Sequence, residues 1–206
     1  MKGKTQRNGP TARGRTKRRV RSDAQRSIEA LLRAAKEVFA ASGVDASVRE
    51  ISEKAGVGIG TLYRHFPERA DLIAAVFRQE LDACADAAED LASKYGPGEA
   101  LERWIKRYAD LVATKRGLAA ALHSGNPAFD NLPAHFDLRL RPALRGLLDA
   151  AVRAGEMRAD VDSDELLTAV ASLCMSARQD RPGSSRRMIA LLVDGLRRGV
   201  RPAEVN

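Results

Sequence analysis

Residues 55–72 read AGVGIGTLYRHFPERADL and hold three glycines within five positions, followed by a Tyr-Arg-His triplet and a proline. Glycines spaced in this way occur in phosphate-binding loops, around catalytic or metal sites, and in turns that approach a nucleic acid. A dinucleotide fingerprint needs a preceding strand and a glycine where Thr61 stands, and a P-loop needs Gly-Lys-Ser/Thr, so neither phosphate loop fits. His65 has no His or Cys at ligand spacing, which argues against a metal site.

The residues around these glycines predict two short helices. Ser47 and Glu50 form an S-x-x-E capping box, in which the serine hydroxyl can accept from the Glu50 N–H and the carboxylate from the Ser47 N–H. Gly56 ends this helix, because glycine readily adopts the left-handed conformation of a C-terminal cap. A second helix is predicted over 58–64. Two short helices joined by a glycine-containing turn are typical of a helix-turn-helix unit, with an ordinary three-helix packing unit as the alternative.

The basic charge is concentrated at the start of the chain. The net charge is +8, and nine of the 35 Lys and Arg residues lie in residues 1–21, which contain no acidic residue. The other 26 basic residues stand against 27 acidic ones, so the remainder is almost neutral. We expect residues 1–21 to form a disordered basic arm that is attracted to polyanions such as DNA, RNA or acidic lipid, the alternative being a tail that only aids solubility.

Helical periodicity dominates the rest of the chain, and no convincing strand or repeat is found. Low aromatic content and abundant alanine agree with this, so the predicted fold class is all-α, with about nine helices. Cys84 and Cys174 stand far apart, which argues against a disulfide framework and fits a reducing cytoplasm. No apolar run approaches the ~18 residues of a membrane span, and no apolar segment follows the basic start as in a secretory signal.

Residues 24–72 resemble the DNA-binding domain of TetR-type (tetracycline-repressor-like) transcriptional regulators. The resemblance rests on the alanine-rich first helix ending in Phe39 and Gly43, on Ser47-Val48-Arg49-Glu50-Ile51, on Ala55-Gly56-Val57, on Gly60-Thr61-Leu62-Tyr63-Arg64-His65-Phe66 and on Leu72. It implies a helix-turn-helix domain over 22–72, an effector-binding and dimerisation domain over 73–206, and a homodimer. It implies neither an enzyme nor a cofactor.

The family resemblance places the third helix in the major groove of double-stranded DNA. The arginine fork of Arg64 matches guanine O6/N7. Phosphate contacts are expected from Tyr63 and His65, joined by Ser47, Arg49 and Arg69. The basic arm is expected to lie along the backbone or in a minor groove. The residues expected to contact DNA are Ser47, Val48, Arg49, Gly58, Ile59, Gly60, Thr61, Tyr63, Arg64, His65 and Arg69, with Arg18, Arg19 and Arg21 of the arm.

A two-fold dimer requires a pseudo-palindromic operator. The last two helices carry apolar sets wider than one buried face requires, and the family dimerises through its final two long helices. The residues expected in this interface are Leu166, Val170, Leu173, Cys174, Ile189, Leu192 and Leu196. The same residues are also explained by a core position within one protomer.

The middle helices are expected to line a pocket for a small-molecule effector of unknown identity. The candidate lining residues are Trp104, Tyr108, Leu111, His123, Phe129 and Phe136. Plain core packing is the alternative for each of them. The predicted function is therefore a DNA-binding regulator, most simply a repressor released by an effector, and the alternative is an effector-independent or non-specific DNA-binding protein.

Overall fold

The computed structural model describes residues 12–115, 124–176 and 183–198. Every regular element in these ranges is helical, as predicted for an all-α chain. The elements are α1 (Ala12–Ser42), α2 (Val48–Ala55), α3 (Ile59–His65), α4 (Arg69–Lys94), α5 (Pro97–Lys115), the 3-10 helix η2 (Pro127–Phe129), α7 (Leu132–Arg153), α8 (Ser163–Ser176) and α9 (Ser184–Arg198). The alanine-rich stretch near residues 118–122 also predicts a short helix, and this stretch lies outside the described residues.

The chain divides into two compact units, Met1–Leu72 and Ile73–Asn206. The domain boundary predicted from the sequence also lies between Leu72 and Ile73, and the functions assigned to the two parts stay predictions. Helix α4 begins in the first unit and continues into the second.

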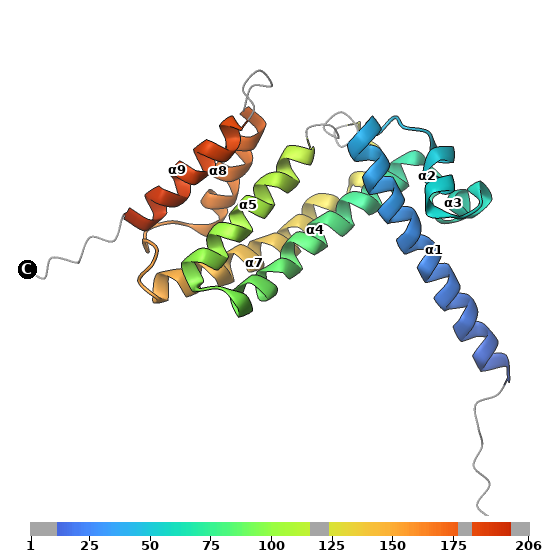
Figure 1. Cartoon of the computed structure of the whole chain (residues 1–206), viewed down its shortest axis with the longest axis horizontal. Helices are drawn as coiled ribbons and strands as arrows, with labels where there is room; N and C mark the ends of the chain where they lie inside the picture. Colours follow the sequence, from blue (N-terminus) through green and yellow to red (C-terminus); the bar gives the residue numbers. More distant parts are fainter. Residues whose placement is uncertain (1–11, 116–123, 177–182, 199–206) are drawn as a thin grey trace, which may run out of the picture. The chain divides into compact units, whose positions relative to one another are not determined.

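In the first unit, α2 and α3 form a compact pair beside the C-terminal half of α1 (Figure 1). Apolar side chains from all three helices and from the start of α4 fill the space between them, because burying this surface is the main stabilising contribution for such short helices. The buried side chains are Leu31, Ala35, Val38, Ile51, Leu62, Phe66 and Leu72. At the surface, Lys54 of α2 forms an ion pair with Glu37 of α1 at 2.8 Å, which holds the pKa of the glutamate below its ordinary value.

The sequence predicts that the first helix begins at Ser22 or Asp23, because either residue can cap a helix, whereas α1 begins at Ala12. Residues 12–21 therefore continue the helix and do not belong to a disordered arm. The physical reason is that arginine, lysine and alanine are good helix formers, and adding turns to an existing helix avoids the cost of nucleation. A run of like charges is therefore compatible with a continued helix as well as with disorder.

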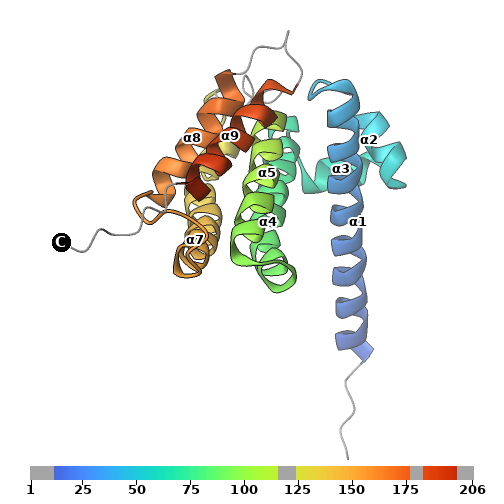
Figure 2. The same ribbon diagram turned by 60° about the vertical axis from the view of Figure 1, so that its left-hand side comes forward.

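The second unit is a helical bundle in which α4, α5 and α7 run beside one another and α8 and α9 pack as a pair (Figures 1 and 2). Its core contains Leu101, Trp104, Ile105, Leu140, Leu144 and Val170, all with at most 1% of their surface exposed. Hydrogen bonds from His135 and Arg139 of α7 to Asp82 join α7 to α4 at 2.9 and 2.8 Å. No helix among the described residues is both long and apolar enough to cross a bilayer.

Candidate functional site

The start of α2 is capped by Ser47. Its hydroxyl accepts a hydrogen bond from the Arg49 N–H at 3.2 Å, and its carbonyl accepts from the Ile51 N–H at 3.2 Å. The prediction that Ser47 caps this helix is confirmed. The donor to its hydroxyl is the Arg49 N–H, and not the Glu50 N–H that the capping box predicts. The side chains of Ser47 and Arg49 are exposed, and Val48 is half-buried.

The turn between α2 and α3 depends on Gly56. Its φ of 68° lies in the left-handed region, and its N–H donates to the Glu53 carbonyl while the next amide, of Val57, donates to the Ser52 carbonyl. This arrangement closes α2 and redirects the chain into α3 within three residues. The helix-turn-helix geometry predicted from the sequence is therefore present in the backbone.

Helix α3 presents one continuous exposed face and one buried side chain. Leu62 is 1% exposed and faces the core of the first unit. Ile59, Gly60, Tyr63 and Arg64 are exposed, and their spacing of i, i+1, i+4 and i+5 places them on one side of the helix. Ile59 and Tyr63 are 41% and 48% exposed, which is uncommon for side chains of this size.

The flanks of this face hold the remaining predicted contacts of α3. Thr61 and His65 are half-buried, and the turn glycine Gly58 is exposed. Around Gly58 and Gly60 a Cβ would meet no atom within 4 Å, so neither glycine is required by packing inside the chain. The α3 surface (Ile59, Gly60, Tyr63 and Arg64) thus combines apolar groups, a guanidinium and a position without a side chain.

Arg69 differs from the other predicted DNA contacts. Its Nη1 donates to the carbonyl oxygens of Val44 at 2.6 Å and Ala46 at 2.7 Å, in the loop between α1 and α2. Arg18, Arg19 and Arg21 fall on the backbone of α1, but their side chains lie outside the described part of the chain.

Two sequence models of protein families match this chain. One, described as "Bacterial regulatory proteins, tetR family", matches residues 31–76, and the other, "Transcriptional regulator SbtR-like, C-terminal domain", matches residues 96–198. The second match alone spans half of the chain. The chain belongs to the TetR family of transcriptional regulators.

Relatives extend the similarity over both units of this TetR-family regulator. The crystal structure of the TetR transcriptional regulator SCO0520 from Streptomyces coelicolor is 37% identical, covering 82% of this chain and 98% of that one, with a TM-score of 0.70. The HTH-type transcriptional repressor KstR2 from Rhodococcus jostii is 25% identical over 81% of this chain and 89% of its own. A γ-butyrolactone receptor (ArpA-like protein) of known structure is 27% identical, covering 88% and 93% with a TM-score of 0.58.

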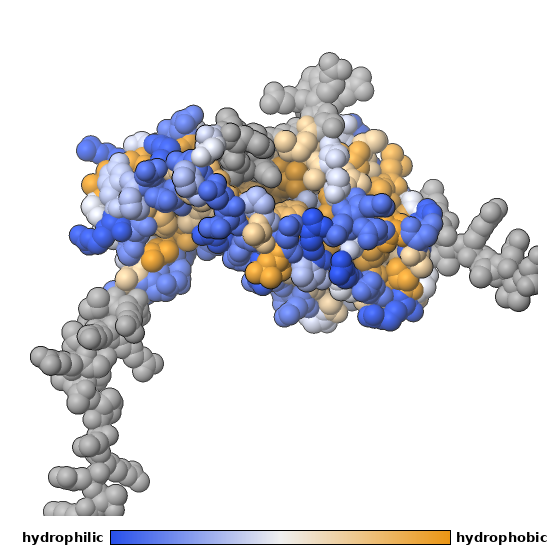
Figure 3. Space-filling model, turned by 180° about the vertical axis from the view of Figure 1, so that it is seen from behind, coloured by the Kyte–Doolittle hydropathy of each residue, from blue (hydrophilic) through white to orange (hydrophobic). Residues whose placement is uncertain are grey.

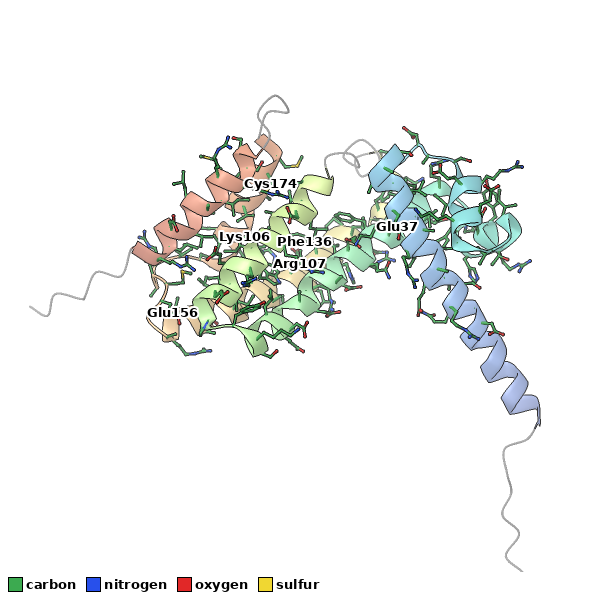
Figure 4. All side chains as sticks on the ribbon, in the orientation of Figure 1. Glu37, Lys106, Arg107, Phe136, Glu156 and Cys174 are labelled. Atoms are coloured by element: carbon green, nitrogen blue, oxygen red, sulfur yellow. The ribbon has the colours of Figure 1, made fainter. Side chains whose placement is uncertain are left out.

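The second unit of the regulator contains a packed aromatic cluster. Trp104 and Tyr108 are stacked with ring centroids 5.7 Å apart. The ring of Phe136, which is labelled in Figure 4 and belongs to α7, lies 6.1 Å from that of Tyr108. The Trp104 Nε1–H donates to the Cys84 carbonyl at 2.9 Å. Trp104 and Tyr108 are at most 2% exposed, so in this structure they belong to the core.

The other candidate pocket residues are not part of this aromatic cluster. Phe129 is buried and Leu111 is half-buried, but no ring contact joins Phe129 to the cluster among the described residues. His123 lies outside the described residues. The effector-pocket prediction therefore stays a prediction, and the structure brings together three of its six residues.

The ionisable groups near this cluster are not activated for chemistry. Burial raises the pKa of the Cys84 thiol to about 12, so the thiol is protonated at neutral pH and a poor nucleophile. Burial also raises the pKa of the Tyr108 hydroxyl. Within the described ranges, no group of three or more His, Cys, Asp or Glu side chains is placed to hold a metal ion.

Most of the predicted interface residues on α8 and α9 face the core of their own protomer. Five of them are at most 4% exposed: Leu166, Val170, Cys174, Ile189 and Leu196. Leu173 and Leu192 are half-buried. The exposed large apolar side chains on these helices are Met175, Met188 and Leu191, of which Leu191 is 62% exposed.

A shallow apolar hollow of about 370 Å³ runs between α8 and α9. Its lining includes Leu191 and Leu192 and the small residues Ala169 and Gly195. Figure 3 shows apolar atoms gathered in patches on the otherwise hydrophilic surface of this unit. Sequence periodicity could not separate the inner apolar face of α8 and α9 from their outer one, and the predicted interface stays a prediction.

A second hollow of about 490 Å³ lies along α4 and α5 and is lined by charges of both signs. Lys106 and Arg107 project from this part of α5 (Figure 4). Lys94 and Arg103 in its lining form ion pairs with Asp90 and Glu99 of their own helices. Ion pairs between residues of one helix are typical of a solvent-exposed helix surface.

Proposed function

We propose that this TetR-family regulator is a repressor that binds a pseudo-palindromic operator as a homodimer and is released by a small-molecule effector. The observation that carries the proposal is the α3 surface, which is exposed although it contains Ile59 and Tyr63. Such a surface suits the major groove, where apolar side chains meet thymine methyl groups and a guanidinium meets guanine.

Each residue of the α3 surface has a proposed role. Arg64 is the candidate for a bidentate hydrogen bond to guanine O6/N7. Gly60 has no side chain, so the helix backbone can come close to the base edges. Thr61, Tyr63 and His65 are proposed to reach base edges or phosphates from the same helix. Ile59 supplies an apolar contact.

Contacts outside α3 are proposed to fix the register on the DNA. Ser47 and Arg49 are exposed at the start of α2, where the backbone N–H groups of a helix favour a phosphate. The basic residues of the arm, including those that continue α1 from Ala12, are proposed to contact the backbone or a minor groove. Phosphate contacts position a protein without selecting a base sequence.

The homodimer is proposed to form through the outer faces of α8 and α9. Met188, Leu191 and Gly195 occupy one stripe of α9, because their spacing of i, i+3 and i+7 follows the helical period. Because Ala169 and Gly195 are small, they open the hollow between the helices and would let a partner helix approach closely. A two-fold axis pairs this stripe with the same stripe of a second copy, as an isologous interface requires.

An effector is supported by the relatives and by the aromatic cluster. A related chain of known structure, the ArpA-like protein, is a γ-butyrolactone receptor. In this chain the effector is proposed to enter beside Trp104, Tyr108 and Phe136, and to favour a spacing of the two α3 helices that no longer matches the operator. Such a shift requires that the effector bind one conformation more tightly than the other. Because the target is DNA, the regulator is proposed to act in the cytoplasm.

A competition gel shift tests the proposal. Labelled DNA from upstream of the gene for this protein is bound by the full chain and challenged with unlabelled upstream DNA or with random duplex of equal length. Preferential displacement by the upstream DNA supports a sequence-specific regulator. Equal displacement supports the alternative, a non-specific DNA-binding protein. Release by candidate metabolites in the same assay separates an effector-controlled repressor from an effector-independent one.

A further inference from the structure

Arg69 is the first residue of α4, and its guanidinium is committed to the loop between α1 and α2. The Nη1 group donates to the carbonyl oxygens of Val44 and Ala46 at 2.6 and 2.7 Å. These bonds join residues that are 25 and 23 positions apart in the sequence. A terminal guanidinium nitrogen carries two hydrogens, so both hydrogens of Nη1 are accounted for by these two carbonyls.

The loop that receives these bonds is short, and its Gly43 N–H donates to the Phe39 carbonyl at 3.0 Å. It consists of Gly43, which has a φ of 79°, and three residues before the capping residue Ser47. One backbone hydrogen bond, from the Ala46 N–H to the Gly43 carbonyl at 3.2 Å, closes the turn. Val44 is half-buried and Ala46 is buried, and backbone carbonyl groups away from water require a hydrogen-bond donor. Arg69 supplies the donor for both carbonyls.

Fixing the Ala46 carbonyl also fixes the start of α2. The peptide unit is planar, so the direction of the Ala46 C=O determines the opposite direction of the Ser47 N–H. Ser47 in turn caps α2 through the Arg49 N–H and the Ile51 N–H. The Arg69 clamp, meaning Arg69 Nη1 with the Val44 and Ala46 carbonyls, therefore sets the position at which α2 begins.

The position of α2 determines that of the α3 surface. Helices of eight and seven residues are too short to be stable alone, so α2 and α3 are held by their loops and by the core that Ile51 and Leu62 share. A change at the start of α2 is passed to α3 through this core. DNA recognition is sensitive to such changes, because several base-edge contacts must be met together.

We propose that Arg69 is a positioning residue for DNA binding: the Arg69 clamp holds the start of α2, and Arg69 does not itself neutralise a DNA phosphate. The proposal rests on the proposed DNA-binding function and revises the phosphate contact that the sequence suggested for Arg69. Arg49 provides the comparison, because it is an exposed arginine of the same domain with a proposed phosphate contact.

The test compares Arg69→Met with Arg49→Met in the full chain by two measurements. Amide hydrogen exchange of the free protein follows the Ala46 N–H, and operator binding is titrated at several salt concentrations. For Arg69→Met we expect exchange at Ala46 to become at least about tenfold faster, because the turn opens more often. Operator affinity should fall about tenfold at every salt concentration, with an unchanged salt slope.

For Arg49→Met the pattern is reversed. Exchange at Ala46 stays as in the native chain, and the slope of log affinity against log salt falls by about 0.9, as expected for one lost phosphate contact. A native exchange rate together with a reduced salt slope in Arg69→Met would overturn the proposal. Absence of any sequence preference in the unmodified chain would overturn the proposed function, and the exchange rates in the free protein distinguish that outcome from failure of the clamp.

Arg69→Lys covers the case in which Arg69→Met does not fold. Lysine keeps the positive charge but lacks the rigid planar fork. A phosphate contact predicts near-native affinity for this variant. The clamp predicts faster exchange at Ala46 and weaker operator binding with a native salt slope, and native exchange with native affinity would contradict it.

Discussion

Gly60→Ala should make the first unit more stable and its DNA binding weaker. In the free chain a Cβ at Gly60 meets no atom within 4 Å, and the backbone there does not adopt a positive φ. The methyl group therefore adds no clash, while alanine is favoured over glycine in a helix by about 0.5–1 kcal/mol. For a domain of this size, that gain raises the midpoint of thermal unfolding by about 2–8 °C.

The effect on DNA binding has the opposite sign. If the α3 backbone contacts base edges at Gly60, an added methyl group overpacks the interface, which typically costs about 1–3 kcal/mol. The operator affinity should then fall by a factor of about 5–150. Fluorescence anisotropy with a labelled operator duplex measures the affinity, and circular dichroism measures the unfolding midpoint.

Gly146→Ala is the matched control for this prediction. Gly146 is exposed within α7, and a Cβ there also meets no atom within 4 Å. This variant should gain a similar helix preference without weakening DNA binding. If Gly60→Ala bound the operator as tightly as the native chain, the argument that α3 approaches DNA closely at this position would be refuted.

Three further predictions concern base reading, assembly and pH. Arg64→Ala should weaken operator binding by about 1–3 kcal/mol and relax the base preference at one base pair of each half-site. Binding to duplexes with single base-pair substitutions measures this preference. A uniform loss of affinity across all sequences would show that Arg64 contacts only phosphate. Leu191→Glu should convert the proposed dimer into a folded monomer in light scattering. Leu138→Glu, at a leucine of α7 that is 72% exposed, should leave the proposed dimer intact, and a dimeric Leu191→Glu chain would exclude this interface. Hydrogen bonding to Lys106 holds the pKa of Glu102 below its ordinary 4.5. The difference in the free energy of unfolding between the native chain and Glu102→Gln should therefore have its full value above pH 4.5 and vanish as the pH falls through the lowered pKa. A difference that persists in denaturant titrations at low pH would contradict this assignment.

The helix-turn-helix backbone could be predicted because its determinants are local. Ser47 marks the start of α2 and Gly56 its end, and both act through hydrogen bonds to residues within four positions. The buried position of Leu62 and the exposed positions of Tyr63 and Arg64 follow from the helical period alone. The family resemblance then assigns this unit to DNA.

Features that depend on tertiary contacts could not be predicted. The sequence shows the charge of Arg69, from which a phosphate contact is predicted, but it does not show that Arg69 donates to the carbonyls of Val44 and Ala46, which lie more than 20 residues away. The apolar residues of α8 and α9 all fit a helical stripe, and only packing reveals that Ile189 faces inward while Leu191 faces outward.

The start of α1 and the aromatic cluster show two other limits of sequence reasoning. A run of like charges favours disorder on average, but residues 12–21 contain no proline, and α1 continues through them from Ala12, just after Pro10. Trp104 and Tyr108 stand at helical spacing, which is equally compatible with a pocket wall and with core. Their burial in the structure was not determined by that spacing.

The central claim is that this TetR-family regulator reads a two-fold symmetric DNA sequence through α3. It is tested most directly by selecting bound duplexes from a random pool with the full chain at physiological salt and sequencing them. We expect enrichment of one pseudo-palindrome, whose two half-sites are bound by one dimer. Its affinity should be at least about 10³-fold above that for random duplex. Recovery of unenriched sequences with equal affinity for all duplexes would contradict it.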